Sequence, residues 1–122
     1  MNTNDFKVTV VMPVYNAAKY LKEALLSAVH IPEVGEIVLI EDGSKDNSLA
    51  ICEELSRTYE KVSLYVHKNN QNKGASESRN LGILKAKFDY ISFLDADDIY
   101  NVNRFEKEFI SSSLISLKSS IK

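Results

Sequence analysis

The sequence predicts an α/β fold in which a mostly parallel sheet lies between two layers of helices. Four short apolar segments alternate along the chain with three segments whose apolar residues recur at three- and four-residue spacing. This alternation is typical of strands connected by amphipathic helices. The strand segments are also continuous apolar runs, as expected of parallel strands that are buried on both faces. A length of 122 residues suits one domain with its own core.

The first strand and helix follow from residues 8–30. The β-branched run "VTVVMPV", residues 8–14, predicts a strand. Pro13 is expected to end it, because proline has no amide hydrogen for the ladder. The next segment, "NAAKYLKEALLSAVH", has the spacing of an amphipathic helix, and Asn16 is expected to cap its start.

A second strand and helix are predicted over residues 36–42, "EIVLIED", and 48–59, "SLAICEELSRTY". Ser44 is a candidate cap for this helix. Cys52 is the only cysteine, which excludes an internal disulfide. Its place beside apolar helical neighbours favours a small buried hydrophobic residue over a reactive thiol, and it fits a reducing compartment.

Two further apolar runs, residues 62–67 and 90–94, complete the predicted sheet. Between them lie the polar loop "KNNQNKG" and a third predicted helix, residues 75–87. The inward-facing residues of this helix are expected to be Leu81, Leu84 and Ile83. Right-handed crossovers then leave a Rossmann-like half, a three-layer sandwich, as the leading topology.

We expect residues 1–105 to form the folded part and residues 106–122 to form a C-terminal helix or a frayed tail. The apolar spacing of this last segment favours a helix. Its ending, "SSSLISLKSSIK", is rich in serine, which is a middling helix former.

Charge and hydropathy exclude some classes of protein. Fifteen basic and 17 acidic residues give a net charge of −2, so no global basic field points to a nucleic-acid partner. No apolar run approaches the roughly 20 residues that cross a bilayer, and "MNTNDFK" does not have the pattern of a signal peptide. The expectation is a soluble, cytoplasmic protein.

Polar residues follow each predicted strand, in "PVYN", "EDGS", "HKNN" and "DADD". The carboxyl ends of parallel strands meet at one edge of a sheet, so these motifs should face one crevice. Asp95 and Asp97 form a D-x-D pair that can share a divalent cation, Mg²⁺ or Mn²⁺. The alternative is a solvated turn in which Asp97 or Asp98 caps a following helix.

Asp42 is a candidate for reading a nucleobase. A carboxylate accepts hydrogen bonds only, so a base that it binds must offer a ring N–H, as uracil, thymine and guanine do. A functional Asp42 therefore favours a UDP-, dTDP- or GDP-linked ligand. The structural alternative, a tight turn, can account for the neighbouring Gly43 and Ser44.

Other polar side chains leave two interpretations open. Tyr15 can stack on a base or simply pack, and Arg79 can contact a nucleotide or be a surface charge. His30 and His67 are interpreted as structural, since neither has a second histidine at metal-ligand spacing. The glycine-rich phosphate-binding loops are absent, which favours metal as the means of holding a diphosphate.

Four blocks of this sequence together resemble a known family. They are "VTVVMPVYNAAKYLKEALLSAV", "EIVLIEDGSKDNSLAI", "NKGASESRNLGI" and "YISFLDADD". In this order they resemble the N-terminal half of family-2 inverting glycosyltransferases with the GT-A fold, over roughly residues 7–105. The resemblance implies a nucleotide-sugar donor, most often a UDP-sugar.

The resemblance also implies roles for nucleotide-binding residues. Pro13 and Tyr15 match the loop that lines the base, Asp42 matches the aspartate that bonds the base, and Arg79 matches an arginine near the nucleotide. Glu41 departs from the pattern, since the family usually has a second aspartate there.

The D-x-D pair has a further implied role. Asp95 and Asp97 match the residues that contact ribose and hold the metal, Mn²⁺ or Mg²⁺, on the diphosphate. Asp97 is the stronger metal candidate.

The parts of such an enzyme that follow the D-x-D motif are not expected in this chain. The catalytic base is expected beyond residue 122, and Glu106 and Glu108 look like charges on a helix surface. The acceptor, a glycan or lipid-linked glycan of polysaccharide biosynthesis, would place the protein in the cytoplasm or at the membrane periphery.

Two rival hypotheses remain at this point. One is a catalytically incomplete fragment that binds nucleotide without turnover, with an exposed apolar patch through which it self-associates. The other is a nucleotidyltransferase, which ranks last because such enzymes usually carry a glycine-rich basic loop early in the chain.

Overall fold

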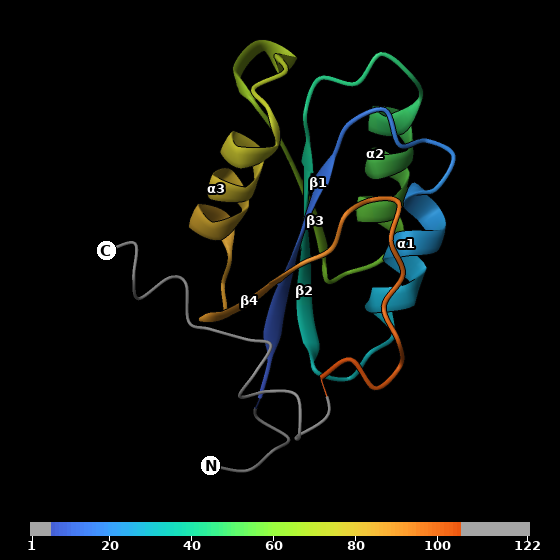
Figure 1. Ribbon diagram of the computed structural model, residues 1–122, viewed down its shortest axis with the longest axis vertical. Coiled ribbons are helices and arrows are strands. Elements are labelled where there is room, and N and C mark those ends of the chain that lie inside the picture. The colour runs from blue at the N-terminus through green and yellow to red at the C-terminus, as the bar shows by residue number, and fades with distance from the viewer. Residues whose placement is uncertain (1–5, 106–122) are drawn as a thin grey trace.

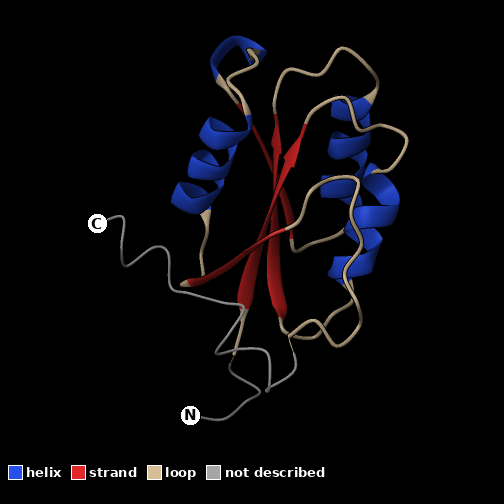
Figure 2. Ribbon diagram, viewed as in Figure 1, coloured by secondary structure: helices blue, strands red, loops and turns tan. Residues whose placement is uncertain are grey.

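The computed structural model describes residues 6–105 and confirms the α/β fold. The predicted helix or tail at 106–122, with Glu106 and Glu108, lies outside the described residues. A parallel sheet forms the centre of the molecule, with helices on both faces (Figures 1 and 2). Its strands are β1 (Val8–Val14), β2 (Val34–Glu41), β3 (Val62–Val66) and β4 (Tyr90–Phe93).

Helices α1 (Leu21–Val29) and α2 (Ser48–Thr58) cover one face of the sheet, and α3 (Ala75–Lys85) covers the other. A short 3₁₀ turn, η2 (Lys68–Asn70), follows β3. The strand order is β3-β2-β1-β4, so the chain reverses its direction of growth between β1 and β4. In sheets of this kind ligands bind at that switch point, beyond the carboxyl ends of the strands.

Alternate residues of the central strands face opposite helical layers. Met12 and Leu39 pack with α1 and α2 in the larger core cluster. Val11 and Val38 pack with Ile83 of α3 in the smaller one. The continuous apolar runs of β1 and β2 are therefore explained by burial on both faces, as the sequence predicted.

Helix α3 approaches the sheet closely because glycine and serine face it. Its buried residues are Ser78, Gly82 and Ile83, whereas Leu84 is 68% exposed. The prediction that Leu84 points inward is therefore wrong. Small side chains let the helix backbone lie near β1, and Leu84 falls outside that stripe.

Pro13 does not end the first strand, which continues to Val14. Alternate residues of a strand bond to opposite neighbours, and Leu94 N–H donates to the carbonyl of Val11, on the β4 side. Pro13 faces this same side, beyond the point where β4 ends. Its missing amide hydrogen therefore costs the ladder no bond.

Two predicted helix caps are also wrong. Helix α1 begins at Leu21, and Asn16 adopts a left-handed φ of 49° well before it. The Asn16 side chain instead accepts a hydrogen bond from the amide of Lys45, at 2.8 Å. Ser44 does not cap α2, which begins at Ser48; its hydroxyl bonds to Glu41.

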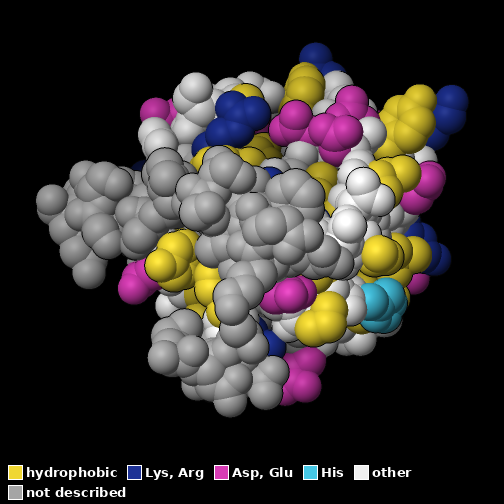
Figure 3. All heavy atoms as spheres, turned by 60° about the horizontal axis from the view of Figure 1, so that its bottom comes forward, with side chains coloured by type: hydrophobic (Ala, Val, Ile, Leu, Met, Phe, Trp, Pro, Cys, Tyr) yellow, Lys and Arg dark blue, Asp and Glu magenta, His cyan; other side chains and the backbone are white. Residues whose placement is uncertain are grey.

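The described residues on one face of the molecule carry mixed charges. On the face that Figure 3 views, acidic, basic and apolar side chains are interspersed among the described residues. Within residues 6–105, no helix has the length and apolar character needed to span a bilayer.

Candidate functional site

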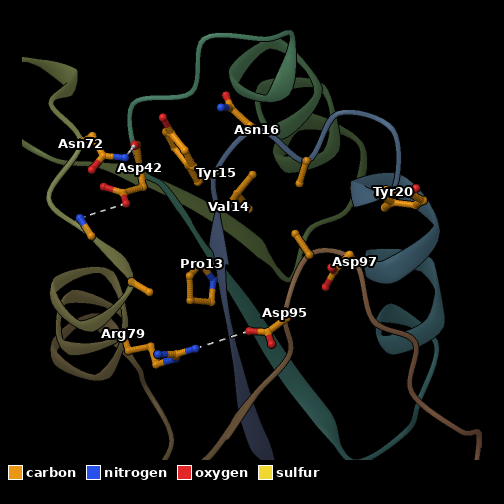
Figure 4. Close-up of a pocket in the computed structure, with 14 residues that line it drawn as sticks. Pro13, Val14, Tyr15, Asn16, Tyr20, Asp42, Asn72, Arg79, Asp95 and Asp97 are labelled. Carbon is orange, nitrogen blue, oxygen red and sulfur yellow. Dashed lines mark hydrogen bonds and ion pairs between the residues drawn. The ribbon is translucent and has the colours of Figure 1, made fainter.

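A cavity of about 520 Å³ lies at the carboxyl ends of β1, β2 and β4 (Figure 4). This volume is within the range of small-molecule sites in proteins. All six residues predicted from the sequence line it: Pro13, Tyr15, Asp42, Arg79, Asp95 and Asp97. The structure thus brings together side chains that are separated by up to 84 positions, counting from Pro13 to Asp97.

Asp42 forms one wall of the cavity and is almost completely buried. Its carboxylate accepts hydrogen bonds from the backbone amides of Lys73, at 2.7 Å, and Gly74, at 3.1 Å. The Asn72 side chain donates to the Asp42 carbonyl at 3.0 Å. Asp42 therefore fixes the loop between η2 and α3 against the end of β2.

A largely buried histidine lies next to Asp42. His67 Nε2 is 3.0 Å from Ser78 Oγ and 3.4 Å from Asp42 Oδ1. The interpretation of His67 as a structural, hydrogen-bonded side chain agrees with these contacts. The histidine joins β3 and α3 to the carboxylate at the cavity wall.

Three consecutive amides hold the loop after β1 in place. The amides of residues 16–18 donate to Ser44 Oγ, Ser48 Oγ and Asp46 Oδ2, at 2.8, 2.9 and 3.1 Å. The hydrogen bond from Ser48 lowers the pKa of the Asp46 carboxyl below its ordinary value. This anchoring places Tyr15, which is 45% exposed, at the rim of the cavity.

The structure shows how a glutamate fits at position 41, where the family usually has an aspartate. It is fully buried, and its carboxylate accepts hydrogen bonds from the amide and hydroxyl of Ser44. The longer side chain thus reaches across the turn that contains Gly43. Gly43 has a φ of 69°, and a Cβ there would lie 2.8 Å from the Asn72 amide nitrogen, so only glycine fits.

The exposed carboxylates of Asp95 and Asp97 line the opposite wall, and Asp98 lies beside them outside the lining. One oxygen each from Asp95, Asp97 and Asp98 lie within 4.8 Å of one another. In an octahedral Mg²⁺ site the oxygens lie about 2.1 Å from the ion and opposite oxygens about 4 Å apart, which is comparable with the spacing of these three carboxylates. Hard oxygen donors of this kind fit Mg²⁺ or Mn²⁺.

Arg79 reaches across the cavity toward the acidic side chains. Its guanidinium lies 3.5 Å from Asp95 Oδ1, and the two side chains point toward each other in Figure 4. Both are partly exposed, so this pair contributes little to stability. It does keep a positive charge beside the carboxylates, where a phosphate would need one.

Tyr100 anchors the chain after the acidic turn. Its hydroxyl lies 2.5 Å from Ser92 Oγ and donates to the Phe93 carbonyl at 3.0 Å. Its amide donates to Ser27 Oγ of α1, at 2.9 Å. Burial raises the pKa of Tyr100 above its ordinary value. These bonds tie the segment that carries Asp97 to both β4 and α1.

The structure describes turns and no helix from residue 99 to 105. Asp97 and Asp98 therefore cap no helix in that span. Of the structural alternative for the D-x-D pair, only the turn is observed. In this turn the Asp98 amide donates to the Asp95 carbonyl.

Sequence reasoning missed part of the cavity lining, which also includes Val14, Asn16, Ala17, Tyr20, Asn72, Gly74, Ala75 and Ala96. The sequence does indicate an irregular loop before the third helix, since "KNNQNKG" is rich in residues that tolerate positive φ. Asn69, Asn70 and Gly74 adopt φ values of 59°, 54° and 94°. Nothing in the sequence marks Tyr20 as a cavity residue, because its spacing fits the apolar face of an ordinary helix.

Comparison with known proteins agrees with this geometry. Residues 9–109 match the model of Glycosyl transferase family 2. An uncharacterized glycosyltransferase of Haemophilus influenzae is 38% identical over 102 residues, which are 83% of this chain and 40% of that protein. The minor teichoic acid biosynthesis protein GgaB of Bacillus subtilis is 38% identical over 112 residues, covering 87% of this chain and 12% of that protein.

A solved structure shows the same architecture. The crystal structure of S. aureus TarS 1-349 in complex with UDP-GlcNAc superposes with a TM-score of 0.72 at 27% identity. The match covers 84% of this chain and 30% of that one, and it confirms the predicted GT-A fold. This chain spans less than half the length of each of these relatives. The four sequence blocks, the fold and the family match agree, and the chain belongs to glycosyl transferase family 2, a family of glycosyl-transferring enzymes.

Proposed function

We propose that this chain forms the donor site of an inverting glycosyltransferase and binds a nucleotide-diphospho-sugar, preferably a UDP-sugar, with a divalent cation. The observation that carries the proposal is the convergence of Asp42, Arg79, Asp95 and Asp97 on one cavity at the switch point of the sheet. S. aureus TarS, which shares the fold at 27% identity, was crystallised with UDP-GlcNAc, and this supports the choice of ligand.

The base would occupy the wall formed by Asp42, with Tyr15 and Pro13 beside it. The carboxylate of Asp42 accepts hydrogen bonds only, so it favours uracil over cytosine, which lacks a ring N–H. Tyr15 presents a half-exposed ring on which a base can stack.

The diphosphate would lie between Arg79 and the acidic turn. Asp97, with Asp95, would hold Mn²⁺ or Mg²⁺, and Asp95 would also face the ribose. When bound, such a cation stabilises the negative charge that develops on the departing nucleoside diphosphate. Arg79 supplies positive charge from the other side of the same space.

Inverting transfer also needs a base that takes the proton of the acceptor hydroxyl as that oxygen attacks the anomeric carbon. We assign the described residues to the donor half of this reaction only. The acceptor, proposed to be a glycan or a lipid-linked glycan, and the base belong to the whole enzyme. The similarity to a teichoic acid biosynthesis protein supports a polymer-building role.

Calorimetric titration with UDP tests the proposal. UDP should bind in the presence of Mn²⁺, bind far more weakly in EDTA, and lose its metal-dependent binding in Asp97→Ala. CDP serves as the matched control, because it carries the same diphosphate with a base that offers no ring N–H. Absence of UDP binding to the folded wild-type chain would refute the proposed function.

A further inference from the structure

We propose that His67 is a positioning residue for the donor site: it orients the Asp42 carboxylate so that one acceptor position faces the cavity and selects bases with a ring N–H. This inference rests on the proposed function. It assigns a binding role to a side chain that does not line the cavity itself.

The three side chains form a buried network at the junction of β2, β3 and α3. Asp42 and Ser78 are 4% and 0% exposed, and the His67 side chain is 9% exposed. A buried carboxylate is costly unless hydrogen-bond donors surround it. His67, just after β3, brings a ring nitrogen to 3.4 Å from this carboxylate without lining the cavity itself.

The contacts decide which ring nitrogen of His67 carries a hydrogen. Nε2 faces Asp42 Oδ1 at 3.4 Å and Ser78 Oγ at 3.0 Å. A carboxylate oxygen accepts only, and an unprotonated nitrogen there would set two lone pairs against each other. Nε2 therefore carries the hydrogen, which it shares between Asp42 Oδ1 and Ser78 Oγ.

Most hydrogen-bond acceptor positions of the Asp42 carboxylate are already used within the protein. A carboxylate offers about four acceptor positions. The amides of Lys73 and Gly74 occupy one on each oxygen, and His67 faces a further one on Oδ1. About one position is left, and the cavity is the space that Asp42 lines. A single ring N–H would complete the set.

The three donors differ in how firmly the fold holds them. Lys73 and Gly74 belong to a loop that contains residues with positive φ. His67 directly follows β3, its carbonyl accepts the Asn70 amide at 2.8 Å, and its ring is held by α3. The imidazole is thus the donor that ties the carboxylate to regular elements, and its loss would let the carboxylate turn toward the loop.

The test separates binding of the base from binding of the diphosphate. UDP and inorganic pyrophosphate, each with Mn²⁺, are titrated into the full chain as wild type, His67→Leu and His67→Gln. Leucine removes the donor, whereas glutamine places an amide N–H near the position of Nε2. His30→Gln is the matched control, because His30 is the other histidine and is exposed, against Tyr59.

We expect His67→Leu to weaken UDP binding on the order of tenfold, the effect of losing one hydrogen bond to a charged group. Pyrophosphate binding should be unchanged in every variant. His67→Gln should restore most of the UDP affinity, and His30→Gln should behave as wild type.

The outcomes distinguish this inference from the proposed function. A wild-type chain that binds no UDP overturns both. If wild type binds UDP and His67→Leu binds it equally well, only the role of His67 is overturned. The same holds if UDP and pyrophosphate weaken together in His67→Leu, because that pattern would show a general structural defect.

Discussion

Replacing Gly82 with alanine tests how closely α3 packs on the sheet. A Cβ added at Gly82 would lie 2.2 Å from Val11 Cγ1 and 3.0 Å from Val11 Cγ2. Carbon atoms in contact prefer about 3.5–4.0 Å, so the helix or the valine would have to move by more than about 1 Å. Val11 is fully buried in β1, which pairs with strands on both sides, and cannot withdraw.

Two opposing effects set the change in the free energy of unfolding of Gly82→Ala. Overpacking of a core costs about 1–3 kcal/mol, and a contact this short belongs at the upper end. Alanine recovers about 1 kcal/mol of helix propensity relative to glycine. The expected net loss is about 2 kcal/mol, which lowers the melting temperature of a domain of this size by roughly 10 °C.

Thermal and urea unfolding of Gly82→Ala measure this loss. Leu84→Ala is the matched control: it lies on the same helix, is 68% exposed, and should change stability by less than about 0.5 kcal/mol. Adding Val11→Ala to Gly82→Ala should relieve the clash, so that the double variant is more stable than the sum of the two single changes. A Gly82→Ala chain as stable as wild type would refute the close packing of α3 on β1.

Three further predictions concern other described residues. The Asp46 carboxyl has a pKa below its ordinary 3.8, chiefly because of its hydrogen bond with Ser48. The ionised carboxylate therefore stabilises the folded state above about pH 4, and this contribution is lost as the pH falls through the lower pKa of the folded state. The difference in melting temperature between wild type and Asp46→Asn should therefore shrink between about pH 5 and about pH 2, and a constant difference would contradict this. Burial raises the pKa of Cys52 to about 12, so a thiol reagent at about pH 8 should label it only after urea unfolding; rapid labelling of the folded chain would show that the thiol is accessible. Tyr100→Phe removes the hydroxyl that bonds Ser92 and should cost about 1–2 kcal/mol in urea unfolding, whereas an unchanged midpoint would mean that this bond contributes nothing.

The fold was predictable because its main signals are local. Burial on both faces forces continuous apolar runs in β1 and β2, and amphipathic spacing marks α1 and α2. The predictions were wrong where tertiary contacts determine where a strand ends or which face of a helix is buried. Pro13 stays in β1 because β4 has already ended, and Leu84 faces solvent because the face of α3 that packs on the sheet is the one that carries Ser78, Gly82 and Ile83.

The site was predictable to the extent that strand ends converge in a parallel sheet. That rule alone predicts that Asp42 and Asp97 lie at one edge of the sheet. It could not reveal that Asp42 also holds the loop at Lys73, or that His67 lies 3.4 Å from the Asp42 carboxylate. These contacts join residues 25 to 31 positions apart, and no local pattern specifies them.

The central claim is that metal and nucleotide share one site at the carboxyl edge of the sheet. Paramagnetic broadening by Mn²⁺ of backbone amide signals, recorded by NMR with and without UDP, tests it most directly. Broadening is expected at Asp95–Asp98, strengthened by UDP and abolished in Asp97→Asn, with amides near Lys61 at the opposite edge unaffected. Broadening centred elsewhere, or equal broadening in Asp97→Asn, would contradict it.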